Sequence, residues 1–304
     1  MYRGRRAAGL KLSGGRDEVH TLLLGGAKPA DMEVGIVARK GNPEAASVAA
    51  GIRDAVRDAG ATVWIDEETA IDLDVEGRPV DALADCDLAV AVGGDGTFLF
   101  VARNAGDAPI LGVNLGEVGF LNAVPPGAAE EAVLTAVEGF RDGAMAVREV
   151  PRLAARADGW ESVPAANEVV VQGARRGPDG GVDYELRVDG SRYASGHADG
   201  VLVATPTGST AYNLSERGPL VHPDVDGLIV NEMAPEEGMP PLVVDVDATV
   251  AVSVSDPDGA VVVSDGRNAR EFPGPIEVTV ERTTPPMRIA GPESDFFEAL
   301  KKLS

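Results

Sequence analysis

Hydrophobic positions in the first half of the chain follow two alternating patterns. Short apolar runs predict buried strands at 34–38, 62–66, 87–92 and 110–114. Residues 43–59 and 128–140 are instead amphipathic at helical spacing, as at Val48, Ile52 and Val56, and predict two helices. Alternating strands and helices favour a parallel sheet covered by helices on both faces.

After about residue 146 the pattern changes to one of strands and turns. Five valines between 244 and 254 alternate with polar residues, which predicts a single half-buried antiparallel strand. Further strands are expected at 167–172, 184–189, 200–205, 228–232, 260–264 and 276–281. A short amphipathic helix is expected at 295–303.

These patterns predict an α/β domain that begins at residue 32 and ends near 146, followed by an all-β domain over 147–281. Residues 1–31 are rich in Arg and Gly, and we interpret them as a disordered or mis-annotated extension, with Met32 as the alternative start to Met1. The apolar run at 21–24 is too short for an export signal. No apolar run approaches the length of a membrane span, so no membrane association is expected.

The charge balance changes the picture of the environment. Asp and Glu number 49 against 27 Lys and Arg, giving a net charge of −22, and only five of the basic residues are Lys. Such an acidic, Lys-poor chain indicates adaptation to molar salt, with an acidic protein from an ordinary environment as the alternative. No basic stripe is visible, which argues against nucleic-acid binding.

Cysteine and histidine usage narrows the chemistry further. Cys86 is the only cysteine, so no intramolecular disulfide forms, and a reducing, cytoplasmic compartment is expected. Its place before a buried strand predicts a small core residue. The three histidines lack metal-type spacing, and no residue is assigned as a metal ligand.

The strand at 87–92 runs directly into Gly93-Gly94-Asp95-Gly96, ahead of a helix expected to start near Thr97. Glycines without Cβ atoms allow phosphate oxygens to approach backbone N–H groups. Asp95 would repel phosphate, so it suits a proton acceptor or a carboxylate that faces Mg²⁺. The alternative is a tight turn whose acidic residue simply favours the helix dipole.

A second motif covers residues 199–215. A buried strand leads into a Pro/Gly turn that is rich in hydroxyl groups, and a helix follows. Ser209 or Thr210 is the expected N-cap, and the free N–H groups beyond it could hold a ribose, an amide or a phosphate.

Together these motifs resemble the NAD kinase family, which phosphorylates the adenosine 2′-hydroxyl of NAD to give NADP. Asn167-Glu168, the 218–223 segment and a shorter block at 115–121 match in the family's order, and the resemblance runs from about residue 33 onward. It implies a phosphofructokinase-like α/β domain to which residues 282–304 return. It also implies ATP as donor with Mg²⁺ or another divalent cation, NAD as substrate, and a homo-dimer or homo-tetramer.

The resemblance also implies roles for individual residues. Asp95 is the general base, and coordination of Mg²⁺ is its alternative role. Asn167 and Glu168 contact the dinucleotide, Asp199 lies near the nicotinamide end, and Tyr212 lies near the adenosine, at a possible subunit interface. The remaining binding candidates are Gly94, Gly96, Phe120, His197, Thr207, Thr210, Ala211, Ser215 and Asp265.

One segment departs from the family pattern. Residues 234–241 lack the usual Pro-His-[ST]-Leu-x-x-Arg-Pro stretch, which bears on subunit and donor contacts. The alternatives to an NAD kinase are a non-catalytic NAD(P)-binding regulator and a lipid kinase that shares the glycine turn. The sequence does not choose between ATP and polyphosphate, or between NAD and NADH.

Overall fold

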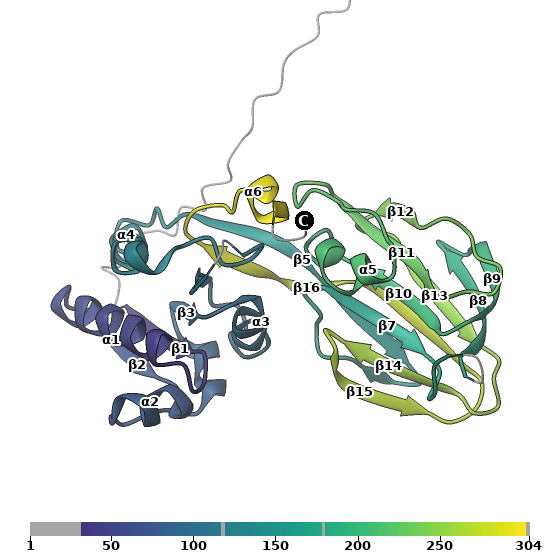
Figure 1. Ribbon diagram of the computed structural model, residues 1–304, viewed down its shortest axis with the longest axis horizontal. Coiled ribbons are helices and arrows are strands. Elements are labelled where there is room, and N and C mark those ends of the chain that lie inside the picture. The colour runs from purple at the N-terminus through teal and green to yellow at the C-terminus, as the bar shows by residue number, and fades with distance from the viewer. Residues whose placement is uncertain (1–31, 117–118, 178–179, 302–304) are drawn as a thin grey trace, which may run out of the picture.

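The computed structural model describes residues 32–116, 119–177 and 180–301, so the 1–31 extension and the last residues of the predicted 295–303 helix lie outside it. An α/β domain and a β-rich domain lie at opposite ends of the molecule. Two long strands, β5 (Val147–Ala157) and β16 (Ile276–Ala290), run from one to the other (Figure 1).

The α/β domain contains the predicted parallel sheet. Its strands lie in the order β2-β1-β3-β4 and comprise β1 (Glu33–Ala38), β2 (Thr62–Ile65), β3 (Leu88–Val92) and β4 (Ile110–Val113). Successive strand residues face opposite sides. Leu88 and Val90 pack with helices α1 (Pro43–Asp58) and α4 (Ala129–Arg141), whereas Ala89 packs with α3 (Asp95–Asn104). Helix α2 (Glu67–Leu73) follows β2.

Cys86 belongs to the core on the α3 side, as predicted. Burial raises the pKa of its thiol to about 12, so the group behaves as a small apolar side chain.

The β-rich domain is a sandwich of two sheets. One has the order β12-β11-β10-β7-β14-β15, and the other extends from β16 through β13 and β8 to β9. Their facing side chains, among them Val169, Val201, Leu186 and Val252, form one core. The strand bounds are β6 (Trp160–Glu161), β7 (Glu168–Gln172), β8 (Val182–Val188), β9 (Ser191–Ala198), β10 (Gly200–Ala204), β11 (Gly227–Met233), β12 (Leu242–Asp245), β13 (Val250–Val254), β14 (Ala260–Ser264) and β15 (Arg267–Phe272).

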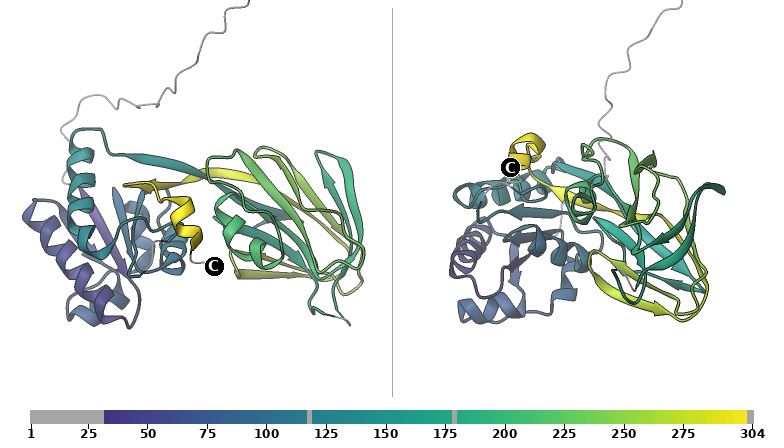
Figure 2. Two further views of the ribbon diagram at one scale, coloured as in Figure 1. Left: turned by 45° about the horizontal axis from the view of Figure 1, so that its top comes forward. Right: turned by 45° about the vertical axis from the view of Figure 1, so that its right-hand side comes forward.

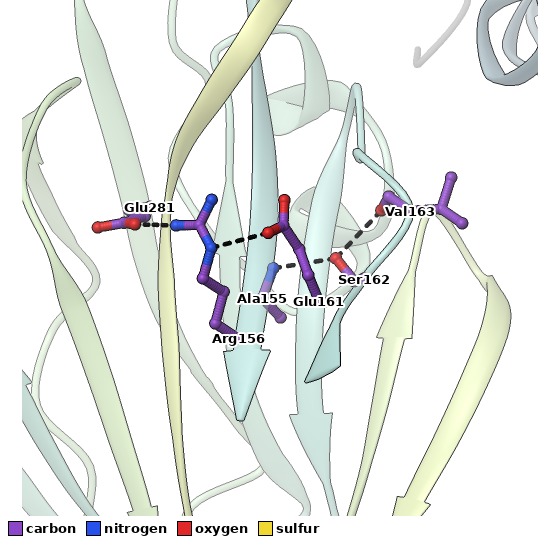
Figure 3. Close-up of polar contacts among 6 residues, drawn as sticks. All are labelled: Ala155, Arg156, Glu161, Ser162, Val163 and Glu281. Carbon is purple, nitrogen blue, oxygen red and sulfur yellow. Dashed lines mark hydrogen bonds and ion pairs between the residues drawn. The ribbon is translucent and has the colours of Figure 1, made fainter. Parts of the chain in front are cut away.

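The long ribbon joins the domains through backbone pairing. Ile289 of β16 pairs with Ile110 of β4, while most of β16 pairs with β5. Farther along, Arg156 of β5 binds Glu161 at 3.0 Å and also contacts Glu281 of β16 (Figure 3). The expected division at 146/147 and 281/282 thus falls where β5 begins and within β16, in strands and not in a linker.

The single strand expected over 244–254 is wrong. β12 ends at Asp245, β13 begins at Val250, and the two lie in different sheets. Asp245 accepts hydrogen bonds from the N–H groups of Asp247 (2.9 Å) and Ala248 (3.0 Å), which makes a turn. The alternation of apolar residues continues through that turn, so the pattern does not reveal it. Among the strands that were not predicted, β15 is exposed at five of its six residues and β9 at four of its eight.

The C-terminal helix α6 (Phe296–Leu300) returns to the α/β domain, as expected. The hydroxyl of Ser294 donates to the carbonyl of Gly119 at 3.1 Å, and the rings of Phe296 and Phe120 lie 6.0 Å apart. The ring centroids of Phe296 and His222, a residue of the β-rich domain, lie 5.1 Å apart, so α6 lies between the two domains (Figure 2). Within the described ranges no helix is both long and apolar enough to cross a bilayer.

Candidate active site

The glycine turn connects β3 directly to α3. The helix begins at Asp95, two residues before the predicted Thr97, with Gly94 as its N-cap. A Cβ at Gly93 would lie 2.4 Å from the hydroxyl of Thr97, so close packing requires glycine there. A Cβ at Gly94 or Gly96 would meet no described atom within 4 Å. Open space therefore adjoins the turn on the side where a ligand can reach the backbone.

The Asp95 carboxylate is held by the loop that follows β4. It accepts hydrogen bonds from the backbone N–H groups of Phe120 (3.4 Å) and Leu121 (3.3 Å). A Cβ at Gly119 would lie 2.5 Å from this carboxylate, so only glycine allows the approach. Asn122 ties the loop to the turn by donating to the carbonyl of Gly93 at 3.3 Å. Asp95 is thereby oriented, and each oxygen keeps capacity to accept a proton.

Asp265 holds the backbone of the Asn167-Glu168 pair through hydrogen bonds. Its carboxylate accepts from the backbone N–H groups of Ala166 (2.9 Å), Asn167 (2.8 Å) and Glu168 (3.2 Å). Burial nevertheless raises the pKa of Asp265, because its desolvation outweighs the three N–H donors. Its carboxylate therefore positions the pair through the backbone.

Glu168 is a buried acid with spare bonding capacity. Its residue is 5% exposed, and Oε2 has no hydrogen-bond partner among the described residues. Burial first, and the charge of Asp265 second, raise the pKa of Glu168 to about 8, although the N–H of Tyr212 bonds to it. Buried polar atoms are rarely left unpaired, so this oxygen marks a site for a polar ligand atom.

The hydroxyl-rich loop crosses the Asn167-Glu168 pair closely. Thr205 donates through its hydroxyl to the carbonyl of Ala166 (2.6 Å) and through its N–H to that of Asn167 (2.9 Å). A Cβ at Gly208 would lie 2.1 Å from the Asn167 carbonyl oxygen. This contact brings the predicted loop residues beside the pair, namely Thr207, Thr210, Ala211 and Tyr212.

The expected N-cap is wrong. Residues 207–210 form a 3₁₀ turn, and the one-turn helix α5 (Tyr212–Ser215) that follows has no side-chain cap. Ser209 instead donates to the carbonyl of Val221 at 3.0 Å, and Thr210 donates to that of Thr207 at 3.4 Å. Ser209 thus ties the loop to the 218–223 segment, while Thr210 bonds within the loop.

Two further residues shape this loop. Arg176 donates to the hydroxyl of Tyr212 at 2.6 Å, and its guanidinium carbon lies 5.7 Å from the centroid of the Tyr212 ring. Asn213 was not predicted to matter; it is buried and donates to the carbonyls of Ser209 (3.1 Å) and Pro219 (3.0 Å). The signal for Asn213 in the sequence was an amide side chain within the predicted turn of small residues. Ser215 ends α5 and is exposed.

A small pocket of about 10 Å³ lies where the two domains meet. Phe120 contributes from the α/β domain, Thr207 and Thr210 from the β-rich domain, and Phe296 from α6. The structure thus brings together three predicted binding residues from two separate motifs, Phe120 from the block at 115–121 and Thr207 and Thr210 from the 199–215 motif.

His197 and Asp199 contact a different part of the surface, near Gly177 and Gly180. His197 lies 2.9 Å from both the Asp183 carboxylate and the Gly180 carbonyl, and both acceptors raise the pKa of its imidazole. It lines an open hollow of about 290 Å³ together with Arg175. The Asp199 carboxylate accepts from the N–H of Gly177 at 2.8 Å. Neither residue lines the small pocket at the domain junction.

Comparison with known sequences gives a consistent result. Family models of the ATP-NAD kinase N-terminal and C-terminal domains match residues 34–140 and 166–290. An NAD kinase of Halorubrum lacusprofundi is 75% identical over 275 residues, covering 90% of this chain and 100% of the relative. An NAD kinase of Haloarcula marismortui is 55% identical over 283 residues, with the same coverages. These haloarchaeal relatives agree with the halophilic adaptation inferred from charge.

Solved structures agree with the sequence comparison. The crystal structure of an NAD kinase from Archaeoglobus fulgidus in complex with ATP is 29% identical with a TM-score of 0.73, covering 90% of this chain and 100% of that chain. The crystal structure of yeast NADH kinase complexed with NADH has a TM-score of 0.77 at 20% identity, covering 90% of this chain and 87% of that chain. At this identity the similarity concerns the fold alone. With both domains matched and close relatives covered over their full length, the chain belongs to the NAD kinase family.

Proposed function

We propose that this NAD kinase transfers the γ-phosphoryl group of ATP to the adenosine 2′-hydroxyl of NAD, with Asp95 as the general base. The observation that carries the proposal is the Asp95 carboxylate, fixed by the N–H groups of Phe120 and Leu121 beside open space at the glycine turn. A positioned carboxylate of this kind suits deprotonation of a hydroxyl nucleophile.

The chemistry needs one bond to form and one to break. The 2′-oxygen attacks the γ-phosphorus, its proton passes to Asp95, and the bond from the γ-phosphorus to the bridging oxygen breaks to release ADP. A Cβ at Gly94 or Gly96 would meet no described atom within 4 Å, so a phosphate could approach the backbone of the turn without obstruction by side chains. The donor is ATP in this proposal, as in the complex of the Archaeoglobus relative.

The acceptor site is built from the crossing of two segments. Glu168 and Asn167 would bind the adenosine half, with the unpartnered oxygen of Glu168 free to meet a ribose or base group. Phe120 and the candidates on the 207–215 loop would enclose the same half. His197 and Asp199 would face the remainder of the dinucleotide.

A divalent cation would be held chiefly by the phosphates of ATP. Among the described residues no cluster of three His, Cys, Asp or Glu side chains is placed to hold a metal. Mg²⁺ commonly takes few protein carboxylates besides phosphates, so the turn fits the ion. Coordination of the ion by Asp95 is the alternative to its role as the base. Bound there, the cation would neutralise phosphate charge.

The relatives named above are NAD kinases, and they give no support to a lipid kinase or to a non-catalytic regulator. We extend the proposal to a dimer or tetramer, to a cytoplasmic location and to the domain division at 146/147 and 281/282. The single buried cysteine supports a reducing compartment.

The test is NADP formation from NAD, ATP and Mg²⁺ in molar KCl, with an Asp95→Asn control. Loss of a general base should lower kcat by about 10²–10⁴-fold, while NAD binding is retained because the amide keeps an oxygen acceptor. Wild-type turnover in the Asn variant would remove Asp95 from the mechanism. NAD binding without turnover in the wild-type protein would favour the regulator.

A further inference from the structure

Three arginines follow one another at four-residue spacing along β5, and they differ in how they are bound. Arg156 pairs with Glu161 and Glu281 (Figure 3). Arg152 donates twice to the carbonyl of Pro285, at 2.9 and 2.7 Å. The side chain of Arg148 makes no hydrogen bond or ion pair within the described part of the chain, and its Nε atom is buried.

The unpartnered Nε of Arg148 destabilises the free protein. Burial lowers the pKa of the guanidinium, and the more distant Glu293 and Asp224 oppose that shift. A buried donor without an acceptor is unfavourable, and a charged one is more so. Since β6 and β16 supply acceptors to the other two arginines of β5, the exception at Arg148 indicates an acceptor from a bound ligand.

The position of Arg148 indicates which acceptor that is. Arg148 pairs with Ile289 of β16, and Ile289 in turn pairs with Ile110 of β4, so Arg148 lies where the long strands join the parallel strands of the α/β domain. Its side chain lines the junction pocket with Phe120 and Thr207. The N–H of that same Phe120 binds the Asp95 carboxylate, so the pocket adjoins the proposed base.

We propose that Arg148 binds a phosphate group of the nucleotide substrate at the domain junction. This inference rests on the proposed function, and the phosphate belongs either to the diphosphate of NAD or to the triphosphate of ATP. A guanidinium can bind phosphate oxygens through two parallel N–H groups. In a chain of net charge −22, such a direct contact is needed, because molar salt screens charges beyond roughly 3 Å.

Binding requires the pocket to open. A volume of about 10 Å³ holds no more than about one water molecule. A phosphate would therefore enter only as the side chains of Arg148 and Phe296 separate.

The experiment compares Arg148→Met and Arg148→Lys with a matched control, Arg156→Met, which removes an arginine from the same strand away from the pocket. Dissociation constants for NAD, ATP and adenosine are measured by calorimetry in molar KCl, alongside KM and kcat. Arg148→Met should weaken NAD or ATP by about 10–100-fold, as for a charged hydrogen bond, and leave adenosine unchanged. Lysine should restore part of the loss, and Arg156→Met should change none of the three.

The arms separate the possible results. A loss confined to NAD assigns the diphosphate of the acceptor, and a loss confined to ATP assigns the donor. Unchanged affinity for both, or an equal loss for adenosine, overturns the inference. If the Met variant does not fold, Arg148→Gln replaces it. If the wild-type protein binds ATP through Arg148 but makes no NADP, the proposed function fails and this inference stands.

Discussion

The carboxylate of Asp265 accepts a hydrogen bond from the backbone N–H of Asn167 at 2.8 Å, across 98 positions of the chain. It also bonds to the N–H groups on either side, so one turn residue fixes the backbone of the Asn167-Glu168 pair. The pair therefore depends for its position on a residue that need not touch substrate.

Replacing Asp265 with Ala should destabilise the fold and weaken NAD binding together. The change leaves three N–H donors without their acceptor, which should cost on the order of 3 kcal/mol or more. Chemical denaturation in molar KCl measures the cost. The matched control is Asp258→Ala, an acid in an exposed pair with Arg175, which should cost less than about 1 kcal/mol. Equal stability of the two variants would contradict the assigned role.

Glu168 should make stability fall as pH rises. Its pKa is raised from 4.5 to about 8 by burial, so the folded state keeps a proton that the unfolded state has already released. Between about pH 5 and 8 the free energy of unfolding should therefore decrease, by on the order of a few kcal/mol, and then level off. In the Glu168→Gln variant the free energy of unfolding should depend less on pH over this range than it does in the wild-type protein.

The measurement is thermal unfolding of the unliganded protein at several pH values. Glu131→Gln serves as control, because Glu131 is an exposed acid on α4. If the Glu168→Gln and wild-type curves run parallel from pH 5 to 8, the buried carboxyl does not titrate as stated.

Gly119→Ala should damage catalysis more than binding. The added Cβ would lie 2.5 Å from the Asp95 carboxylate and displace it. A misplacement of about 1 Å can cost roughly 10²-fold in rate, so kcat should fall by about that factor while the affinity for NAD changes little. Gly127→Ala is the control, since its Cβ would meet nothing within 4 Å. An unchanged kcat in Gly119→Ala would show that the loop moves to accommodate the Cβ and that the Asp95 carboxylate keeps its position, which contradicts the prediction.

Removal of salt should destabilise the protein. A net charge of −22 repels itself when the Debye length grows from about 3 Å at 1 M to about 10 Å at 0.1 M. The melting temperature should therefore fall steadily as KCl is diluted. An uncharged osmolyte at equal osmolality should restore less of the loss than KCl does. A melting temperature independent of KCl would contradict the halophilic interpretation.

The fold was predictable where the apolar pattern matched a single element. The runs at 34–38 and 87–92 became β1 and β3 because both faces of a parallel strand are buried. The pattern failed at 246–249, where an Asx turn keeps the alternation in phase while the chain changes sheets. It also failed at β15, whose residues are mostly exposed and leave no apolar signal.

The sequence by itself determined the family, the strand-turn-helix around Asp95 and the acidic surface, because these depend on residue types at short spacing. Only the tertiary structure decided which side chains meet. Phe120 and Thr207 line one pocket, Asp265 fixes the backbone of Asn167, and the Nε of Arg148 has no partner among the described residues while Arg152 and Arg156 are bound. Those relationships depend on the register of β16 against β4 and β5. That register brings distant segments together and leaves no mark in the local order of residues.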